Sequence, residues 1–234
     1  MILFIIRRVI PLHKYVVFLQ LQRCQKIYTS GTFYFMEIAM RRIVMFNWVS
    51  IDGYFAGPGG EIDWIIRDPE VDQALRESRG EATHSESGGS DTMLLGNVTY
   101  TMFENSWPQI AKDPNAPEEM HKLAEEVARM TKVVFSKSRR EVTWENSRLL
   151  HGNLVEEVER LKQEEGSPIL MFGSGTLVQQ LTDAGLIDEY FIAVTPVVLG
   201  KGKPLFAGVQ KNSMHLREAR QFNTGNVLLR YVKN

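Results

Sequence analysis

Hydrophobic and polar positions alternate with two different periods along the chain from residue 41 onward. Short apolar runs, typical of buried strands, recur at residues 43–49, 92–95, 132–135, 147–150, 168–172, 187–194, 214–222 and 227–232. Among the first five runs, apolar residues spaced three or four positions apart predict helices at 69–79, 117–130 and 154–165. Strands that alternate with helices are typical of an α/β fold, in which helices cover both faces of a mostly parallel sheet.

Turn and capping residues mark the ends of these elements. Asp68 before Pro69 is typical of a helix start, and Gly80 is expected to lie just beyond the end of that helix. Asn153 is the expected N-cap of a later helix. The last two runs are joined by Asn-Thr-Gly-Asn at 223–226, so we expect the sheet to end in an antiparallel hairpin.

The amino-terminal region, residues 1–39, is apolar and basic but has no clear period. Positions 1–36 carry lysines and arginines and no acid, and these cations leave the apolar run too broken for a membrane-spanning helix. Two explanations remain open: a transit peptide, or sequence translated from a start codon placed too early, with Met36 or Met40 as the natural start. We favour the second, and expect an extension outside the fold followed by one domain at 40–234.

Composition excludes several classes of function. The 234 residues are 44% hydrophobic with a net charge of −1, which fits a globular domain and gives no indication of a nucleic-acid partner. Cys24 is the only cysteine, so no intrachain disulfide can form and we expect a cytoplasmic protein. The five histidines form no pair at helical spacing, so no metal site is predicted.

Two glycine turns are the strongest indication of a ligand. Gly96 and the Gly173-Ser174-Gly175-Thr176 turn each follow an apolar run and open a stretch with helical spacing. The first N–H groups of such helices and the positive end of the helix dipole favour a phosphate. Two such turns could hold one pyrophosphate from both sides, which indicates a dinucleotide. The alternative is that the glycines serve packing alone.

Two further segments are expected at the carboxyl ends of strands, where ligands bind in open α/β sheets. Ser50 and Asp52 follow the first strand, and Ser136 and Lys137 open the polar segment 136–140. Hydroxyl and cationic groups in that segment suit the 2′-phosphate of NADP, although a solvated turn would have the same composition.

A hydride reaction also needs a proton source. Asp63 and Asp68 are candidates because they lie near the entry to the first predicted helix. Asp52, at the end of the first strand, and Asp68 are our predicted catalytic residues. Capping of the helix is a strong alternative role for Asp68.

These motifs together resemble the dihydrofolate-reductase-like superfamily, and more closely its branch that includes the reductase domain of riboflavin biosynthesis. The segments that carry the resemblance stand in the same order: Val49–Gly53, Leu94–Tyr100, Val134–Lys137, Phe172–Leu177, Leu186–Tyr190 and Thr195–Phe206. The resemblance implies an NADPH-dependent reductase on a mixed sheet of eight to nine strands. It places the cofactor against Ser50 and three turns, namely Gly96, Asn97 and Thr99; Ser136 and Lys137; and Gly173, Ser174, Gly175 and Thr176.

The departures from that branch concern the substrate. Tyr54 stands where the riboflavin enzymes typically have lysine, Phe172 where they usually have an acid, and Asn97 where related sequences often have arginine. Two polar-to-aromatic changes favour a less charged substrate than a ribose phosphate. We therefore predict a homodimeric NADPH-dependent reductase of a small heterocyclic or carbonyl compound. The alternatives are the riboflavin-pathway 5-amino-6-(5-phosphoribosylamino)uracil reductase and a non-catalytic NADP-binding module.

Overall fold

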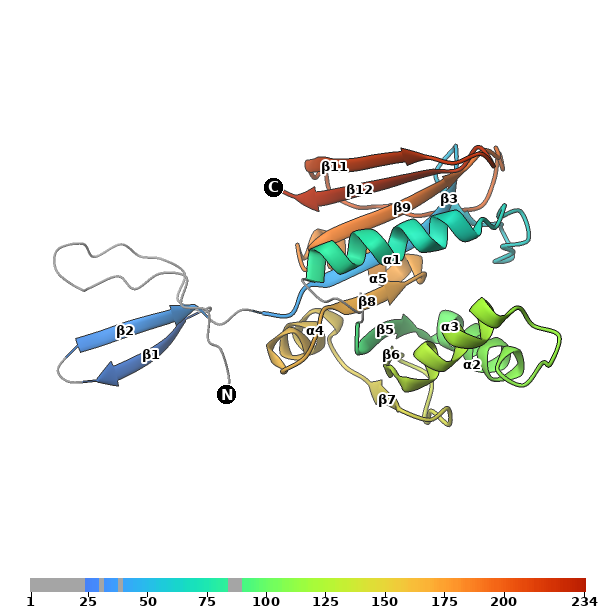
Figure 1. Cartoon of the computed structure of the whole chain (residues 1–234). Helices are drawn as coiled ribbons and strands as arrows, with labels where there is room; N and C mark the ends of the chain where they lie inside the picture. Colours follow the sequence, from blue (N-terminus) through green and yellow to red (C-terminus); the bar gives the residue numbers. More distant parts are fainter. Residues whose placement is uncertain (1–23, 30–31, 38–39, 84–89) are drawn as a thin grey trace. The chain divides into compact units, whose positions relative to one another are not determined.

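The computed structural model describes residues 24–29, 32–37, 40–83 and 90–234. The chain divides into two compact units, Met1–Met40 and Arg41–Asn234. In the first unit, strands β1 (Cys24–Thr29) and β2 (Thr32–Glu37) pair in antiparallel fashion (Figure 1). The sequence pattern did not predict this hairpin. That the region is an extension outside the fold stays a prediction.

The second unit is built on an eight-stranded sheet in the order β11-β12-β9-β3-β8-β5-β6-β7 (Figure 1). Its strands are β3 (Ile43–Ser50), β5 (Thr92–Gly96), β6 (Thr131–Phe135), β7 (Ser147–Leu150), β8 (Ile169–Phe172), β9 (Glu189–Thr195), β11 (Met214–Gln221) and β12 (Val227–Lys233). All neighbours from β9 to β7 pair in parallel, whereas β12 is antiparallel to both β9 and β11. The predicted mixed sheet with a carboxyl-terminal antiparallel hairpin is confirmed.

Helices occupy the stretches where helical spacing predicted them. They are α1 (Pro69–Thr83), α2 (Asn97–Ile110), α3 (Glu118–Arg129), α4 (Leu154–Gln163) and α5 (Gly175–Asp183). The expected end of α1 before Gly80 is wrong, because the helix continues through this glycine to Thr83. A glycine inside a helix costs only about 1 kcal/mol, which the rest of a helix can offset. The predicted cap of α4 is confirmed, since Asn153 Oδ1 accepts the N–H of Val155 at 3.0 Å.

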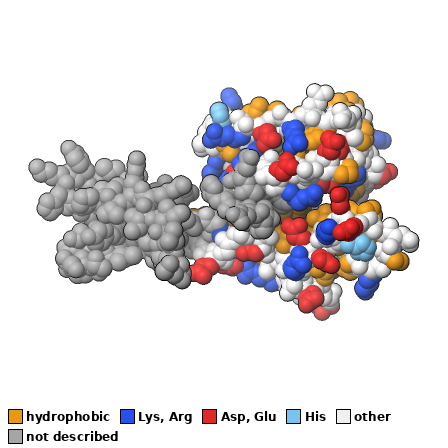
Figure 2. All heavy atoms as spheres, viewed as in Figure 1, with side chains coloured by type: hydrophobic (Ala, Val, Ile, Leu, Met, Phe, Trp, Pro, Cys, Tyr) orange, Lys and Arg blue, Asp and Glu red, His pale blue; other side chains and the backbone are white. Residues whose placement is uncertain are grey.

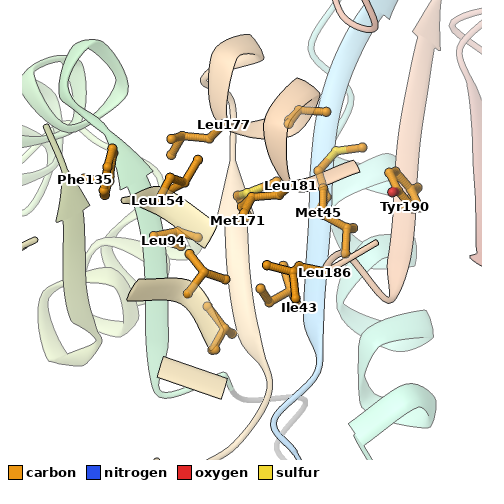
Figure 3. Close-up of a cluster of buried hydrophobic side chains, with 14 of the residues drawn as sticks. Ile43, Met45, Leu94, Phe135, Leu154, Met171, Leu177, Leu181, Leu186 and Tyr190 are labelled. Atoms are coloured by element: carbon orange, nitrogen blue, oxygen red, sulfur yellow. The ribbon is translucent and has the colours of Figure 1, made fainter. Parts of the chain in front are cut away.

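The core lies on both faces of the sheet. Every residue of β3 is buried, and successive side chains alternate between the two faces. Ile43 and Met45 pack with apolar residues of α4 and α5, whereas Val44 and Phe46 pack with those of α1, α2 and α3. Figure 3 shows the first of these layers, with Leu181 of α5 beside side chains of the sheet. Burial on both faces explains why the strand sequences are continuous apolar runs.

A second, two-stranded sheet was not predicted. β4 (Tyr54–Ala56) follows β3 and pairs in antiparallel fashion with β10 (Lys203–Pro204). The pairing fastens the segment after β9 to the segment after β3, and Leu205 N–H also donates to Gly53 O at 3.1 Å. These short strands lack a two-residue alternation long enough to be recognised in the sequence.

Candidate functional site

The carboxyl edge of the parallel strands brings together the four segments expected there. β3, β8, β5 and β6 are neighbours in the sheet and run in the same direction. Their carboxyl ends therefore lead into Ser50–Asp52, the turn at 173–176, the turn at Gly96 and the segment 136–140, respectively. This edge is the candidate site.

The two glycine turns fit into one another. A Cβ atom on Gly96 would collide with the side chain of Ser174, and a Cβ atom on Gly173 would lie 2.9 Å from Thr99 Oγ1. Gly173 and Ser174 also have positive φ angles of 57° and 55°. Packing between the turns therefore requires glycine at both positions. Both glycines therefore serve packing, and their contacts with a cofactor stay a prediction.

Both helices that begin at these turns lack a side-chain cap. The N-cap residues are Gly96 for α2 and Ser174 for α5, and neither gives a side-chain hydrogen bond to the first turn. In α4, by contrast, Asn153 satisfies two of these N–H groups. Uncapped first-turn N–H groups together with the helix dipole are suited to bind an anion. The interlocked turns hold two such helix starts side by side.

The polar segment after β6 divides into buried and exposed parts. Ser136 is buried, and its Oγ accepts the N–H groups of Ser138 at 3.3 Å and Arg139 at 3.0 Å, which closes a tight turn. Lys137 and Arg140 are exposed. The exposed cations of this segment are the groups that could meet an extra phosphate, while Ser136 shapes the turn that presents them.

Sequence reasoning missed His151 beside this segment, and it did not predict the contacts that Arg139 makes from within it. His151, which follows β7, has Nδ1 2.8 Å from Ser136 O. The Arg139 side chain contacts α2 and donates from Nε to Asn97 Oδ1 at 2.7 Å. Both contacts join residues far apart in the chain, so no local spacing indicates them. Because Asn97 Oδ1 already accepts from Arg139, its amide nitrogen is the group left for the predicted phosphate contact.

Asp52 joins two loops at this edge. Its carboxylate accepts hydrogen bonds from Ser50 Oγ at 2.7 Å, Leu199 N–H at 3.1 Å and Gly200 N–H at 2.7 Å. The bond from Ser50, followed by those from the two backbone groups, lowers the pKa of Asp52 below its ordinary value. An aspartate held as an anion is a poor proton donor at neutral pH. Its contacts give Asp52 a structural role, and its catalytic role stays a prediction.

Asp68 is buried at the start of α1 and caps it. Its Oδ1 accepts the N–H of Glu70 at 2.9 Å, and its Oδ2 accepts from Thr224 Oγ1 in the turn between β11 and β12. These bonds confirm the capping alternative. Asp63, the other proton-donor candidate, is exposed.

Three buried polar atoms near the ends of β3 and β9 have no hydrogen-bond partner within the described part of the chain: Trp48 Nε1, Thr195 Oγ1 and Asn226 Oδ1. Thr195 pairs with Ser50, and Asn226 precedes the residue opposite Val194, so Thr195 and Asn226 lie side by side, with Trp48 two residues before Ser50 on the neighbouring strand. An unpartnered buried polar atom costs about 1–3 kcal/mol. These positions therefore offer groups that a ligand with matching donors and acceptors could satisfy.

An aromatic row begins at the same place. Ring centroids lie 5.9 Å apart for Trp48 and Phe46, 6.1 Å for Phe46 and Phe172, 5.9 Å for Phe172 and Phe103, and 5.9 Å for Phe103 and Trp107. The rings of Phe172, Phe103 and Trp107 are only partly buried. Partly exposed aromatic rings are suited to contact a planar, weakly charged molecule.

Other kinds of site find little support in the described residues. On the face shown in Figure 2, acidic and basic side chains are interspersed rather than gathered by sign. The described residues contain no group of three or more His, Cys, Asp or Glu side chains arranged to hold a metal ion. Among the helices described, none combines the length and apolar character needed to cross a membrane.

Known proteins were compared with this chain by sequence and by structure. The chain is 32% identical to the uncharacterized protein YyaP of Bacillus subtilis over 199 residues, which cover 85% of this chain and 98% of the relative. A deaminase/5-amino-6-(5-phosphoribosylamino)uracil reductase from Thermotoga maritima superposes with a TM-score of 0.57 at 15% identity, over 83% of this chain and 57% of that one.

A more distant enzyme shares the fold of this chain, and the sequence matches a known family. Dihydrofolate reductase from Enterococcus faecalis, complexed with NADP(H), superposes with a TM-score of 0.53 at 14% identity, over 82% of this chain and 96% of the other. The fold is therefore dihydrofolate-reductase-like. Residues 41–229 match the family described as the RibD C-terminal domain, and the chain belongs to that family.

Proposed function

We propose that the chain is an NADPH-dependent reductase that transfers hydride to a small, planar heterocyclic or carbonyl substrate. Its family and the named reductase activity of the similar Thermotoga protein support a reductase. The observation that carries the proposal is the pair of uncapped helix starts, α2 and α5, held together at one edge of the sheet. One pyrophosphate would meet the first turns of both helices.

The segment after β6 supports a contact with the adenosine end of NADPH. Lys137 and Arg140 are exposed on either side of Arg139, which contacts Asn97 at the start of α2, and there they would meet a 2′-phosphate. The similar dihydrofolate reductase was solved with NADP(H), which supports the same class of cofactor here. When bound, the nicotinamide would supply the hydride, and the residues of this chain would orient it and the substrate.

The substrate would lie near the end of β3. The partly buried rings of Phe172 and Phe103 offer apolar contact to a planar ring, and Thr195 and Asn226 offer unpartnered polar atoms. The carboxylates of Asp52 and Asp68 both accept hydrogen bonds within the protein, Asp52 from Ser50 and Gly200, and Asp68 from Glu70 and Thr224. We propose that these bonds fix the segments around the substrate, and the predicted catalytic roles of Asp52 and Asp68 stay predictions.

Cofactor binding tests the proposal directly. The wild-type protein should bind NADPH more tightly than NADH in a calorimetric titration. Lys137→Ala should remove most of the difference, about 10- to 100-fold, because one charge-assisted contact contributes roughly 1.5–3 kcal/mol. Lys122→Ala is the matched control, since Lys122 is also exposed but pairs with Glu118 on α3. Equal affinity of the wild-type protein for the two cofactors would contradict the proposal.

The two alternative functions, a riboflavin-pathway reductase and a non-catalytic NADP-binding module, each have their own test. The riboflavin-pathway reduction is favoured by the name of the Thermotoga protein, but Tyr54 and Phe172 stand where the resemblance to that branch leads us to expect polar groups. We expect this chain not to rescue cells that lack that reductase, and rescue at ordinary expression would favour the pathway enzyme. Turnover of NADPH with pterins, the ribosylaminopyrimidine or simple carbonyls would exclude a non-catalytic NADP-binding module.

The homodimer and the cytoplasmic location remain part of the proposal. Sedimentation of the purified chain would measure the first, and imaging of the tagged chain in cells would test the second.

A further inference from the structure

Arg139 joins two parts of the candidate site that are far apart in the sequence. Its guanidinium donates to Asn97 Oδ1 at 2.7 Å, Thr101 Oγ1 at 2.8 Å and Glu104 Oε1 at 2.7 Å, all on α2. It also lies over the Tyr100 ring, with its central carbon 4.6 Å from the ring centroid. The side chains of Arg139 and Glu104 are only 19% and 17% exposed. These contacts span the first two turns of α2.

The backbone of the same residue belongs to the turn that follows β6. Arg139 N–H donates to Ser136 Oγ at 3.0 Å, and Ser138 N–H donates to the same oxygen at 3.3 Å. One residue therefore closes the turn with its backbone and fastens that turn to α2 with its side chain. Exposed Lys137 lies within the turn and Asn97 at the start of the helix.

The Arg139 guanidinium has no donor left for a ligand. Its five N–H groups are used by Nε to Asn97, by Nη2 to Thr101 and Glu104, and by Nη1 to Glu104 at 3.3 Å and Glu141 O at 3.5 Å. An arginine that bound phosphate directly would keep at least one edge of its guanidinium available. The contacts favour a role in holding the two elements together.

We propose that Arg139 is a positioning residue, which sets the distance between the first turn of α2 and the turn at Ser136–Ser138. The inference rests on the proposed function, in which α2 meets the pyrophosphate and the turn meets the 2′-phosphate of one NADPH. A ligand that spans both elements gains from their fixed spacing, because its second contact is then made at high effective concentration. A ligand that touches one element gains nothing from it.

Two probes of different length separate positioning from direct binding. NADPH spans both elements, whereas adenosine 2′-monophosphate reaches only the turn after β6. Arg139→Ala should lower the affinity for NADPH about tenfold or more, and should change the affinity for adenosine 2′-monophosphate less than about threefold. Equal weakening of the two probes would mean that Arg139 binds the 2′-phosphate or that the fold is lost, and would overturn the inference. An unchanged NADPH affinity would overturn it as well.

A second variant keeps the test sharp if Arg139→Ala does not fold. Glu104 lies two turns from the start of α2, so Glu104→Ala acts on the ligand only through Arg139. This variant should also lower the affinity for NADPH more than the affinity for adenosine 2′-monophosphate. Tighter binding would instead mean that a released Arg139 binds phosphate itself. Arg41→Ala is the control, because Arg41 is buried against Asp91 at the opposite edge. A wild-type protein that binds neither probe would overturn the proposed function together with this inference.

Discussion

The amino and carboxyl edges of the same sheet differ in how their polar groups are satisfied. At the amino edge, charged side chains are buried and paired. Glu189, which begins β9, contacts Arg42 and Arg230, and Lys162 of α4 contacts Asp188. Glu189 and Lys162 are almost completely buried. This edge is closed by ion pairs within the chain.

At the carboxyl edge, several groups that could bind a ligand have no hydrogen-bond partner in the described part of the chain. The first turns of α2 and α5 have no side-chain cap. Trp48 Nε1, Thr195 Oγ1 and Asn226 Oδ1 are buried and unpartnered in the described chain. Two further such atoms belong to Ser147 and Arg148, at the amino end of the outer strand β7, and one to Asn47 within β3.

The difference separates stability from function within one sheet. Paired charges at the amino edge are costly to break, because removing one partner takes a counterion from a buried or partly buried charge. Open groups at the carboxyl edge lower the stability of the folded chain, which is typical of sites that a ligand completes. Substitutions at the two edges should therefore differ in which property they change.

The largest loss of stability is expected at the amino edge. Glu189→Ala removes a buried carboxylate and leaves Arg42 and Arg230 without it, which should lower the free energy of unfolding by about 3–5 kcal/mol. Urea unfolding measures the loss. The NADPH affinity of the folded variant should stay unchanged, because this edge is opposite the site. A parallel loss of cofactor affinity would break the separation of the two edges.

At the amino edge, buried Lys132 should make the stability of the protein depend on pH. It is fully buried at the start of β6, and its Nζ donates to Ala128 O at 2.8 Å and Val127 O at 3.3 Å. Burial lowers its pKa from 10.5 to about 8. Between these values the unfolded chain binds a proton that the folded chain does not, so stability rises with pH, by about 3 kcal/mol in total.

The measurement is the free energy of unfolding from pH 7.5 to 11, with Lys132→Met as the reference. Subtracting the variant removes the contribution of other groups, including Tyr190, whose pKa is raised by burial. Because a raised tyrosine pKa makes stability fall above pH 10, the uncorrected profile would understate the effect of lysine. A difference that is flat with pH would contradict the prediction.

At the carboxyl edge, the fit of the two glycine turns is expected to carry stability. Gly96→Ala should cost about 1–3 kcal/mol, because the added methyl group meets the Ser174 side chain. Ser174→Gly removes that side chain at a residue with φ of 55°, which glycine adopts readily. The double variant should therefore be more stable than the sum of the two single effects predicts. Strictly additive free energies would show that the turns do not pack as described.

The elements and the edge that holds the site could be predicted from the sequence, because they depend on local patterns. Buried strands such as β3 are continuous apolar runs, and ligand-facing turns must follow the carboxyl ends of parallel strands. The roles of single residues could not be predicted. Arg139 looked like a phosphate ligand by composition, yet its partners on α2 are about 40 positions away in sequence. The hydrogen bonds of Asp52 to Leu199 and Gly200 were hidden for the same reason.

The smallest change in stability is expected where a buried polar atom without a hydrogen-bond partner is removed. Thr195→Val keeps the shape of a fully buried side chain and removes an Oγ1 that has no partner in the described chain. Stability should stay the same or rise by up to about 1 kcal/mol, because no hydrogen bond is lost and an unsatisfied atom is gone.

If Thr195 serves the substrate, the same variant should lose turnover while NADPH affinity is unchanged. Urea unfolding, calorimetric titration of NADPH and the rate of NADPH oxidation with the best substrate of the screen measure the three properties. A stable variant with reduced turnover would show that the open hydroxyl is kept for function at a cost in stability. A clear loss of stability would mean that Thr195 is satisfied inside the fold. The contrast between the two edges would then no longer hold at this residue.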